Sequence, residues 1–390
     1  MSALPQMGVY IHWPWCLSKC PYCDFNSFAC DPDSLDQEAW RQALLAELDH
    51  CLSQTDRLRI GSVFFGGGTP SLMDPRTITA LLERLAKRRT LSAKLEISLE
   101  ANPGTLDTRR LDDLKLAGIN RLSLGVQALD DGYLKLLGRR HTAKLALKAI
   151  GHIQKRFDRC SIDLIYGRPG QSLEAWQAEL EQALGLGLGH YSLYQLTYDP
   201  ATPLGQAAAS GKVTALSSDE EAEFYTQTLA QMSTNGRSAY EISNFALPKQ
   251  ECRHNRDIWR GGAYLGIGPG AHGRELRQGQ VYITECQPNP ALWLRQVQDK
   301  GHGYKAAQFL LPGERAEELV LMGLRLAEGI DLDRFLQLSG FDLFEVIDPA
   351  ACRRLVKDGF LAEKPGRLQV TDEGRLLLDS LTRVLLTGSP

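Results

Sequence analysis

The sequence lacks any uninterrupted apolar run approaching the roughly 20 residues that a membrane-spanning helix needs. Its first eight residues also lack the basic region and apolar core that are typical of a secretory signal. We therefore expect a cytoplasmic protein without a membrane span, and peripheral contact with a membrane is compatible with that expectation. Thiolates survive in such a reducing compartment.

The chain also lacks an excess of positive charge, because its formal net charge is -3 at pH 7. This balance argues against a general nucleic-acid binder, which needs a basic surface. Hydrophobic residues make up 43% and charged residues 23%, close to globular averages, which excludes disordered and fibrous classes. A chain of 390 residues predicts two or three domains, one of which can be a barrel of about 200 residues.

The nine cysteines lack the pattern of a disulfide framework, because their number is odd and most are scattered. Three of them, Cys16, Cys20 and Cys23, instead form the motif C-x3-C-x2-C. A short loop with this spacing can turn three thiolates toward three corners of a cubane iron-sulfur cluster. The fourth iron then has no protein ligand, which favours a small chelating cofactor. A structural zinc site is the alternative, but no second ligand pair follows, and His12 lies within an expected strand.

Short apolar runs alternate with helical patterns from Gly8 to about Leu196, which is typical of βαβ units around a parallel sheet. The expected strands are Val9–His12, Ser62–Phe65, Leu95–Leu99, Arg121–Leu124, Ser161–Ile165 and Tyr191–Gln195. The expected helices are Gln37–Leu52, Pro75–Lys87, Thr108–Leu116, Ala143–Arg156 and Leu173–Leu186. The best solution in the α/β class is an incomplete (βα)6 barrel.

Chemically distinctive residues follow the expected strands, where the carboxyl ends of parallel strands meet at one edge. The cysteine loop follows the first strand and a glycine run, 66–68, follows the second. Glu100 follows the third and Asp163 lies within the fifth. Two simpler interpretations stay open: Glu100 could pair with Arg121, and Arg139 could belong to a surface basic run rather than pin a carboxylate.

We expect three regions: a barrel over residues 1–200, a linker and ligand-associated segment over 201–310, and a winged-helix-like domain over 311–390. A helix, a turn and two short strands around residues 365–366 make the last region resemble a winged helix. It carries 10 Lys and Arg against 14 Asp and Glu from residue 310 onward. That net charge of -4 argues against DNA binding. We expect the domain to cover the barrel or contact a partner.

Several motifs carry a family resemblance beyond the cysteines. They are Tyr10-Ile-His-Trp-Pro14, Phe65-Gly-Gly-Gly-Thr-Pro-Ser71, Glu100-Ala-Asn-Pro103, Arg121-Leu-Ser-Leu-Gly-Val-Gln127 and Ile162-Asp-Leu-Ile-Tyr-Gly167. Together they resemble the radical S-adenosylmethionine superfamily, and more closely its oxygen-independent coproporphyrinogen III oxidase group. The resemblance implies a [4Fe-4S] cluster on the three cysteines, with S-adenosylmethionine on the open iron. It also implies the cofactor contacts Tyr10, Tyr22, Gly67, Gly68, Thr69, Glu100, Gln127, Arg139 and Asp163.

Two families of that group differ near the cluster motif. The oxidases of that group have the longer motif C-x3-C-x2-C-x-C and an N-terminal extension before the barrel. In this sequence Phe25 stands two residues after Cys23, and the cluster loop begins almost at once. Both differences favour the sister family of HemW heme chaperones. The resemblance then implies a protein that binds heme and transfers it to acceptor proteins, with an electron donor for its cluster. Oxidative decarboxylation of coproporphyrinogen III by a radical mechanism is the alternative.

The heme chaperones also carry an H-N-x-x-Y-W motif, to which residues 254–259 are similar except that Ile258 replaces the tyrosine. The resemblance implies heme contacts from His254, Asn255 and Trp259. A neutral imidazole is a standard ligand of heme iron, and an arginine such as Arg253 or Arg256 can meet a propionate. Cys252 and His272 are the other candidate ligands, and the sequence leaves the choice between His254 and His272 open.

Overall fold

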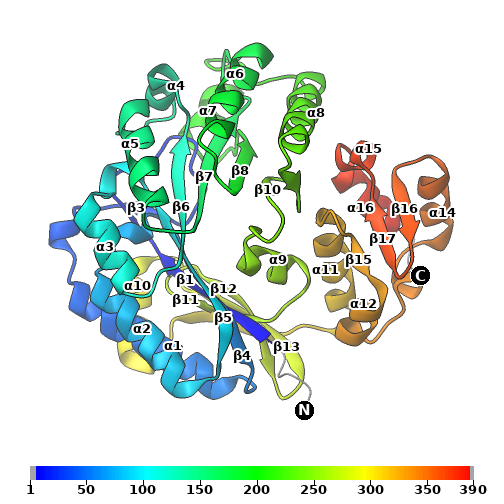
Figure 1. The fold of residues 1–390 in the computed structure, drawn as a ribbon. Helices are drawn as coiled ribbons and strands as arrows, with labels where there is room; N and C mark the ends of the chain where they lie inside the picture. Colours follow the sequence, from blue (N-terminus) through cyan, green and yellow to red (C-terminus); the bar gives the residue numbers. More distant parts are fainter. Residues whose placement is uncertain (1–5, 387–390) are drawn as a thin grey trace.

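The computed structural model describes residues 6–386, which form a large curved sheet with helices and a separate C-terminal domain (Figure 1). Within these residues, the large sheet has twelve strands in the order β14-β13-β12-β11-β1-β4-β5-β6-β7-β8-β10-β9. Its strands from β11 to β8 are parallel neighbours. They are β11 (Tyr264–Ile267), β1 (Gln6–Trp13), β4 (Arg59–Gly67), β5 (Leu91–Ala101), β6 (Arg121–Gln127), β7 (Arg159–Tyr166) and β8 (His190–Gln195).

The outer face of the parallel strands is covered by the crossover helices, as expected for an incomplete (βα)6 barrel (Figure 1). Each of these helices begins after an Asp, Ser or Thr whose side chain accepts a backbone N–H of the first turn. The helices are α1 (Gln37–Gln54), α2 (Pro75–Arg88), α3 (Thr108–Leu116), α4 (Asp131–Leu136), α5 (Ala143–Gln154) and α6 (Leu173–Leu184).

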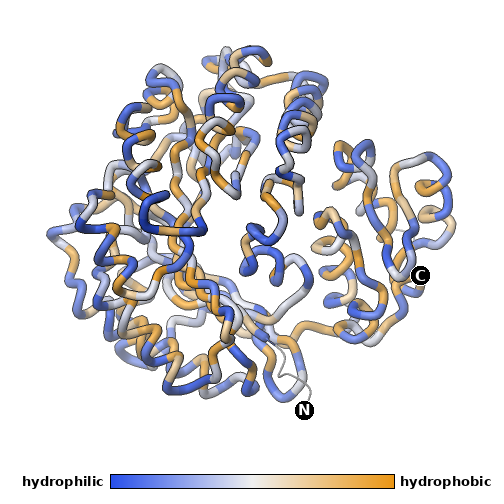
Figure 2. The backbone as a smooth tube through the Cα atoms, viewed as in Figure 1, coloured by the Kyte–Doolittle hydropathy of each residue, from blue (hydrophilic) through white to orange (hydrophobic). Residues whose placement is uncertain are grey.

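The main core lies between these helices and the outward side chains of the strands. In β1, for example, Val9, Ile11 and Trp13 are fully buried there. The intervening residues of β1, such as Tyr10 and His12, therefore face the concave inside of the sheet. Figure 2 shows the same division, with apolar segments along the central strands and polar segments on the outer loops.

In place of the linker expected over residues 201–310, the structure extends the sheet at both ends. Antiparallel strands β12, β13 and β14 continue it beyond β11, while β10 and β9 continue it beyond β8. These strands are short or half-exposed and carry charged residues, so they lack the apolar runs that identify the central strands. The elements are α7 (Pro203–Ala209), α8 (Ser218–Thr234), β9 (Ser238–Ala239), β10 (Asn244–Ala246), α9 (Arg253–Trp259), β12 (His272–Arg277), β13 (Gln280–Cys286), α10 (Pro290–Lys300) and β14 (Tyr304–Phe309).

The C-terminal domain has its own core and a three-stranded sheet in the order β15-β17-β16. A hairpin turns at Gly366, where φ is +70°, and forms the wing expected from the sequence. The expected limits at residues 1 and 390 lie outside the described residues. The elements are α11 (Pro312–Arg325), β15 (Ile330–Asp331), α12 (Leu332–Ser339), α13 (Leu343–Val346), α14 (Pro349–Lys357), β16 (Leu361–Lys364), β17 (Arg367–Val370), α15 (Asp372–Arg375) and α16 (Leu378–Leu386).

No helix among residues 6–386 combines the length and the apolar character that crossing a membrane requires.

Candidate functional site

The cysteine loop leaves the carboxyl end of β1 and is closed by a small parallel pair of strands. These are β2 (Trp15–Cys16) and β3 (Phe28–Ala29). The backbone N–H of Cys30 also donates to the carbonyl of Cys16, at 2.8 Å. All three motif cysteines lie on this closed loop as partly buried free thiols. Burial raises the pKa of Cys16, and the hydrogen bond from Thr69 partly opposes this rise.

Hydrogen-bonding groups reach each thiol of the loop. Thr69 Oγ1 donates to Cys16 Sγ at 3.3 Å, Arg139 Nη1 lies 3.6 Å from Cys20 Sγ, and Ser27 Oγ lies 3.5 Å from Cys23 Sγ. A guanidinium beside thiols favours their anionic form, which is the form that binds iron. Arg139 is held in place because its Nη2 donates to the carbonyl of Gly125 at 2.7 Å.

Three thiols, each with a polar group beside it, are the ligands that a cubane cluster requires. Among the described residues, no three His, Cys, Asp or Glu side chains converge on one point where they could hold a metal ion. A cubane does not need such convergence, because each thiolate binds a different iron at a different corner. The positive charge of Arg139 can offset part of the anionic charge of such a cluster. The three cysteines therefore fit the expected group.

The glycine run between β4 and the next turn is required by close packing against β1. A Cβ on Gly66 would lie 2.8 Å from the ring of Tyr10, and one on Gly67 would lie 2.5 Å from the ring of His12. A Cβ on Gly68 would meet backbone carbonyl oxygens at 2.8 to 2.9 Å. Gly67 also has φ +109°, which L side chains rarely adopt. The run can therefore offer its backbone to a ligand directly beside the cysteine loop.

Two partly buried carboxyl groups, Glu100 and Asp163, lie near each other behind the glycine run. Burial first, and then the nearby Asp163, raise the pKa of Glu100 to about 8. Within the described residues, one donor reaches Glu100: the N–H of Gly67, at 3.1 Å. The alternative pairing with Arg121 does not form, because Arg121 donates to the carbonyl of Gln250 at 3.0 Å. Glu100 therefore retains hydrogen-bonding capacity for a ligand with hydroxyl or ammonium groups.

Asp163 is better satisfied than Glu100. Ser123 Oγ donates to its Oδ1 at 2.9 Å, and Ser192 also bonds its side chain. Burial is nevertheless the largest influence and raises the pKa of Asp163. The sequence interpretation did not name these two serines as partners of Asp163. The available signal was a hydroxyl at inward positions of two otherwise apolar strands.

Gln127 ends β6 in an uncommon backbone conformation. Its φ is +71°, and the pairing of β6 with β7 shifts register between Gly125 and Gln127. The shift directs the Gln127 amide toward Gly125 on the same edge as Arg139. Tyr22 lies on the cysteine loop next to Cys20 and Arg139, and burial raises its pKa. The nine residues expected to contact S-adenosylmethionine thus surround the cysteine loop, and their roles in binding remain predictions.

The candidate heme residues do not gather at this edge. His254 is only 3% exposed, and its Nδ1 lies 2.9 Å from Ser62 Oγ near the amino end of β4. Its ring packs on Phe64, with centroids 5.1 Å apart. Burial lowers the pKa of His254 to about 3. In this structure the imidazole is buried inside the barrel with Nδ1 bonded to Ser62, and its expected role as a heme ligand stays a prediction.

The buried carboxylate of Glu96 explains the position of α9. Glu96 accepts the backbone N–H groups of Arg253 and His254, at 2.8 and 3.2 Å, and pairs with Arg159 at 2.7 Å. Cys252 Sγ also lies 3.6 Å from Glu96, and burial raises the pKa of this thiol to about 12. Sequence reasoning missed Glu96, although a carboxylate within an apolar strand was the available signal. Cys252 is therefore not a free ligand.

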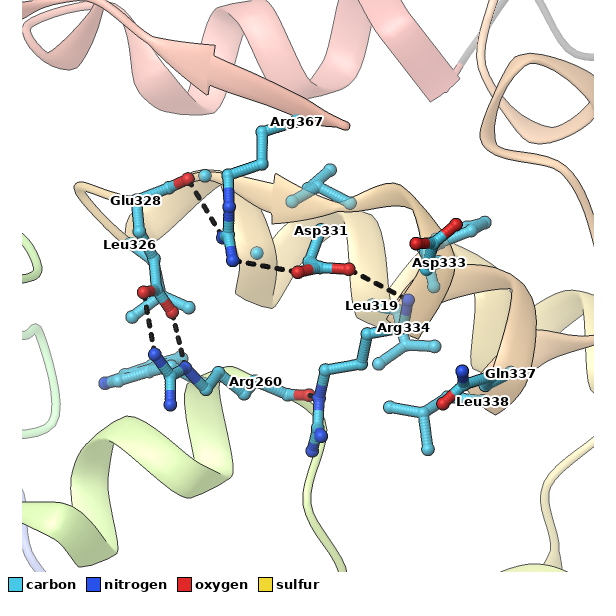
Figure 3. Close-up of a pocket in the computed structure, with 15 residues that line it drawn as sticks. Arg260, Leu319, Leu326, Glu328, Asp331, Asp333, Arg334, Gln337, Leu338 and Arg367 are labelled. Atoms are coloured by element: carbon cyan, nitrogen blue, oxygen red, sulfur yellow. Dashed lines mark hydrogen bonds and ion pairs between the residues drawn. The ribbon is translucent and has the colours of Figure 1, made fainter. Parts of the chain in front are cut away.

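Trp259 points away from the barrel toward the C-terminal domain. Arg325 stacks on its ring, with the guanidinium carbon 4.5 Å from the centroid. Trp259 helps to line a pocket of about 370 Å³ between α9 and the C-terminal domain, in which Arg260 pairs with Glu328 and Arg367 pairs with Asp331 (Figure 3). No His, Cys, Met or Tyr is among the residues that line it, so this pocket offers no usual ligand for heme iron.

The remaining candidates are also separated. Asn255 is partly buried on α9, where Arg253 donates to the carbonyl of Lys94 and Arg256 lies 3.8 Å from Glu251. His272 is exposed at the start of β12, immediately after the loop that leaves the carboxyl end of β11. His254 and His272 thus lie toward opposite ends of the barrel. The expected heme residues do not form one site, and His272 is the accessible imidazole.

Comparisons with known proteins bear on the family and the fold of this chain. The model of the radical SAM superfamily matches residues 10–183, and that of the HemN C-terminal domain matches residues 310–377. The chain is 37% identical to radical S-adenosyl methionine domain-containing protein 1 of Danio rerio, covering 98% of this chain and 87% of that protein. It is 34% identical to the heme chaperone HemW of Escherichia coli, covering 99% and 100%.

A solved structure supports the fold. The coproporphyrinogen III oxidase HemN of Escherichia coli matches with a TM-score of 0.80 and 24% identity, covering 99% of this chain and 91% of that chain. At this identity the match supports the radical SAM architecture and the C-terminal helical domain. It does not distinguish between activities.

Proposed function

The chain belongs to the HemW family of the radical S-adenosylmethionine superfamily, and on that premise we propose that it binds heme and delivers it to acceptor proteins. The observation that carries this proposal is the 34% identity over the full length of the Escherichia coli heme chaperone. We further propose that the protein works in the cytoplasm and receives electrons from a donor protein.

We propose that Cys16, Cys20 and Cys23 hold a [4Fe-4S] cluster. When bound, the cluster supplies one-electron redox chemistry, with S-adenosylmethionine as ligand of its open iron. Arg139 would balance the charge of the thiolates, since it already lies 3.6 Å from Cys20 Sγ. Glu100 would accept a hydrogen bond from a hydroxyl or ammonium group of the cofactor, because its one protein donor is Gly67 N–H.

Phe25 favours a chaperone over the alternative, a coproporphyrinogen III oxidase. Its side chain stands where the oxidase motif has a fourth cysteine, and it is 59% exposed on the cluster loop. A phenyl ring offers neither a thiolate nor a proton to a substrate. Heme, as cargo, would be held by an exposed imidazole, for which His272 is the available candidate. The net charge of -4 from residue 310 onward supports a protein partner, not a nucleic acid, for the C-terminal domain.

The test uses the full chain with its cluster reconstituted under anaerobic conditions. One arm supplies a reductant, S-adenosylmethionine and coproporphyrinogen III, and measures protoporphyrinogen by its fluorescence after oxidation. The other arm titrates heme and follows the Soret band, with wild type and His272→Ala in parallel. We expect one heme per chain, no porphyrinogen turnover, and weaker heme binding in His272→Ala.

The two arms give distinct outcomes. Protoporphyrinogen formation would overturn the chaperone proposal in favour of the oxidase. Absence of saturable heme binding in the wild type would overturn it as well. Unchanged heme binding in His272→Ala would remove His272 as the ligand while leaving the chaperone function supported.

A further inference from the structure

His12 lies 5% exposed on the inner face of β1, and both of its ring nitrogens are used. Nε2 is 2.9 Å from the carbonyl oxygen of Asn26, and Nδ1 is 3.0 Å from Tyr10 Oη. A carbonyl can only accept, so Nε2 must carry the proton. Nδ1 then accepts a hydrogen bond from the Tyr10 hydroxyl. The contacts thus define one neutral tautomer of His12, in which each polar atom has a partner.

Asn26 connects this imidazole to the far side of the cysteine loop. It stands three residues after Cys23, and its Nδ2 donates to the carbonyls of Pro269 and Pro288, both at 2.9 Å. The segment that follows the last cysteine is therefore fastened to β1 by His12 and to two neighbouring loops by Asn26. Loss of the His12 contact would release the carbonyl of Asn26 and loosen the loop that carries Cys23.

The ring of Tyr10 is packed against two other rings in addition to its hydrogen bond with His12. Its ring lies against Phe64 and against His254, with centroid distances of 6.2 and 6.4 Å and interplanar angles of 25°. His254 is in turn fixed by Ser62 Oγ at 2.9 Å. Gly66 also lies against this ring, because a Cβ at that position would be 2.8 Å from it. The ring is thus held between α9 and the glycine run.

We propose that His12 and His254 are positioning residues of the cofactor site. His254 supports the ring of Tyr10 from α9, and His12 joins Tyr10 to the cysteine loop through Asn26. The histidine of the segment that resembles a heme motif therefore acts on the cluster and its S-adenosylmethionine, and not as a ligand of heme. This inference rests on the proposed cofactor site but does not depend on heme binding.

The experiment compares wild type, His254→Ala, His12→Ala and His12→Gln, with His152→Ala on the outer helix α5 as the control. Each reconstituted protein is assayed for iron per chain, for S-adenosylmethionine affinity by calorimetry, and for heme affinity by titration. Loss of a buried hydrogen bond and its packing corresponds to about a tenfold loss of affinity. We expect His254→Ala and His12→Ala to weaken S-adenosylmethionine binding by about that factor, with heme affinity unchanged.

The glutamine variant tests the bonding itself. Its amide nitrogen can donate to the carbonyl of Asn26, so His12→Gln should recover much of the iron content that His12→Ala loses. His152→Ala should leave iron content and S-adenosylmethionine affinity unchanged. If His254→Ala instead loses heme binding while iron and S-adenosylmethionine binding stay normal, the inference is overturned and the heme-ligand role is restored.

Two further measurements protect the result against simple unfolding. Ser62→Ala removes the partner of His254 without opening a large cavity and should shift S-adenosylmethionine affinity in the same direction. Nitrogen-15 NMR of histidine-labelled apoprotein should show His12 with its proton on Nε2, and a proton on Nδ1 would overturn the assignment. If wild type binds no heme, the proposed function fails, whereas the iron and S-adenosylmethionine results still decide this inference.

Discussion

The two ends of the barrel carry the same kinds of side chains but use them differently. At the carboxyl end, the three motif thiols are partly exposed, and Glu100 has one protein donor. At the amino end, Glu96 accepts two backbone N–H groups and pairs with Arg159, and its neighbour Cys252 is buried. The first end has unused bonding capacity, whereas the second is closed by α9. Residue type alone therefore does not identify a ligand site. A polar side chain with hydrogen-bonding capacity that the protein does not use is the better indicator.

The cysteines give the largest expected difference between the two ends of the barrel. Cys20→Ser should remove most of the cluster, lowering iron per chain and the visible absorption near 400 nm by about tenfold, because an alcohol rarely replaces a thiolate on iron. Cys252→Ser, at the other end, should leave both unchanged. Iron analysis after anaerobic reconstitution measures the difference. Equal iron content in the two variants would remove the distinction between the ends.

The carboxylates should differ in the opposite sense, in stability. Glu96→Ala removes the acceptor of two backbone N–H groups and leaves Arg159 without its buried partner, so we expect a loss of about 3 kcal/mol. Chemical denaturation of the apoprotein measures this loss. Glu100→Ala is the matched control and should cost much less, because one N–H bonds that carboxylate. A larger loss for Glu100→Ala would contradict the comparison.

The glycine run should be more sensitive than an ordinary loop glycine. Gly67→Ala places a methyl group 2.5 Å from the His12 ring at a φ of +109°, and we expect it to lower the free energy of unfolding by about 2 kcal/mol. Gly104→Ala is the control, since its nearest neighbour would be 3.6 Å away. Thermal melting of both apoproteins decides the point. Comparable melting temperatures would show that β1 and the His12 ring can move enough to accommodate the methyl group.

The pH dependence offers the smallest but most specific effect. The pKa of Glu100 is about 8, above its ordinary value of 4.5, so the folded protein binds more protons than the unfolded chain between these values. Glu100 therefore makes the apoprotein less stable as pH rises from about 4.5 to about 8. Glu100→Gln should gain about 1 kcal/mol over wild type when pH is raised from 7 to 8. Denaturation curves at both pH values test this, and a parallel response of the two proteins would exclude it.

The central strands and helices were predictable because their patterns are strong. The expected helix Thr108–Leu116 has the same limits in the structure, and the expected strand Arg121–Leu124 lies within β6. Six apolar runs separated by capped helices leave few arrangements other than a partial barrel. The cysteine spacing similarly defines a loop that leaves β1. These features depend on local sequence.

The role of α9 could not be predicted because it depends on distant contacts. His254 meets Ser62, which lies 192 positions away, and Arg253 meets Glu96, which lies 157 positions away. A short motif reveals neither partner. The strands β12 to β14 were missed for a related reason: they are half-exposed, and their pairing follows from neighbours and not from a strong apolar pattern. His12 was noticed, but its partners Tyr10 and Asn26 became clear only in three dimensions.

The left-handed backbone conformation of Gln127 has a consequence for selecting variants of this protein by thermal stability. Glutamine at φ +71° is less stable than glycine would be there, so a screen for heat resistance would favour replacing it with glycine. Such a variant would lose the amide that Gln127 presents beside Arg139. Thermal stability and cofactor binding therefore favour different residues at this position. Variants selected by heating alone would be more stable but would bind S-adenosylmethionine less well.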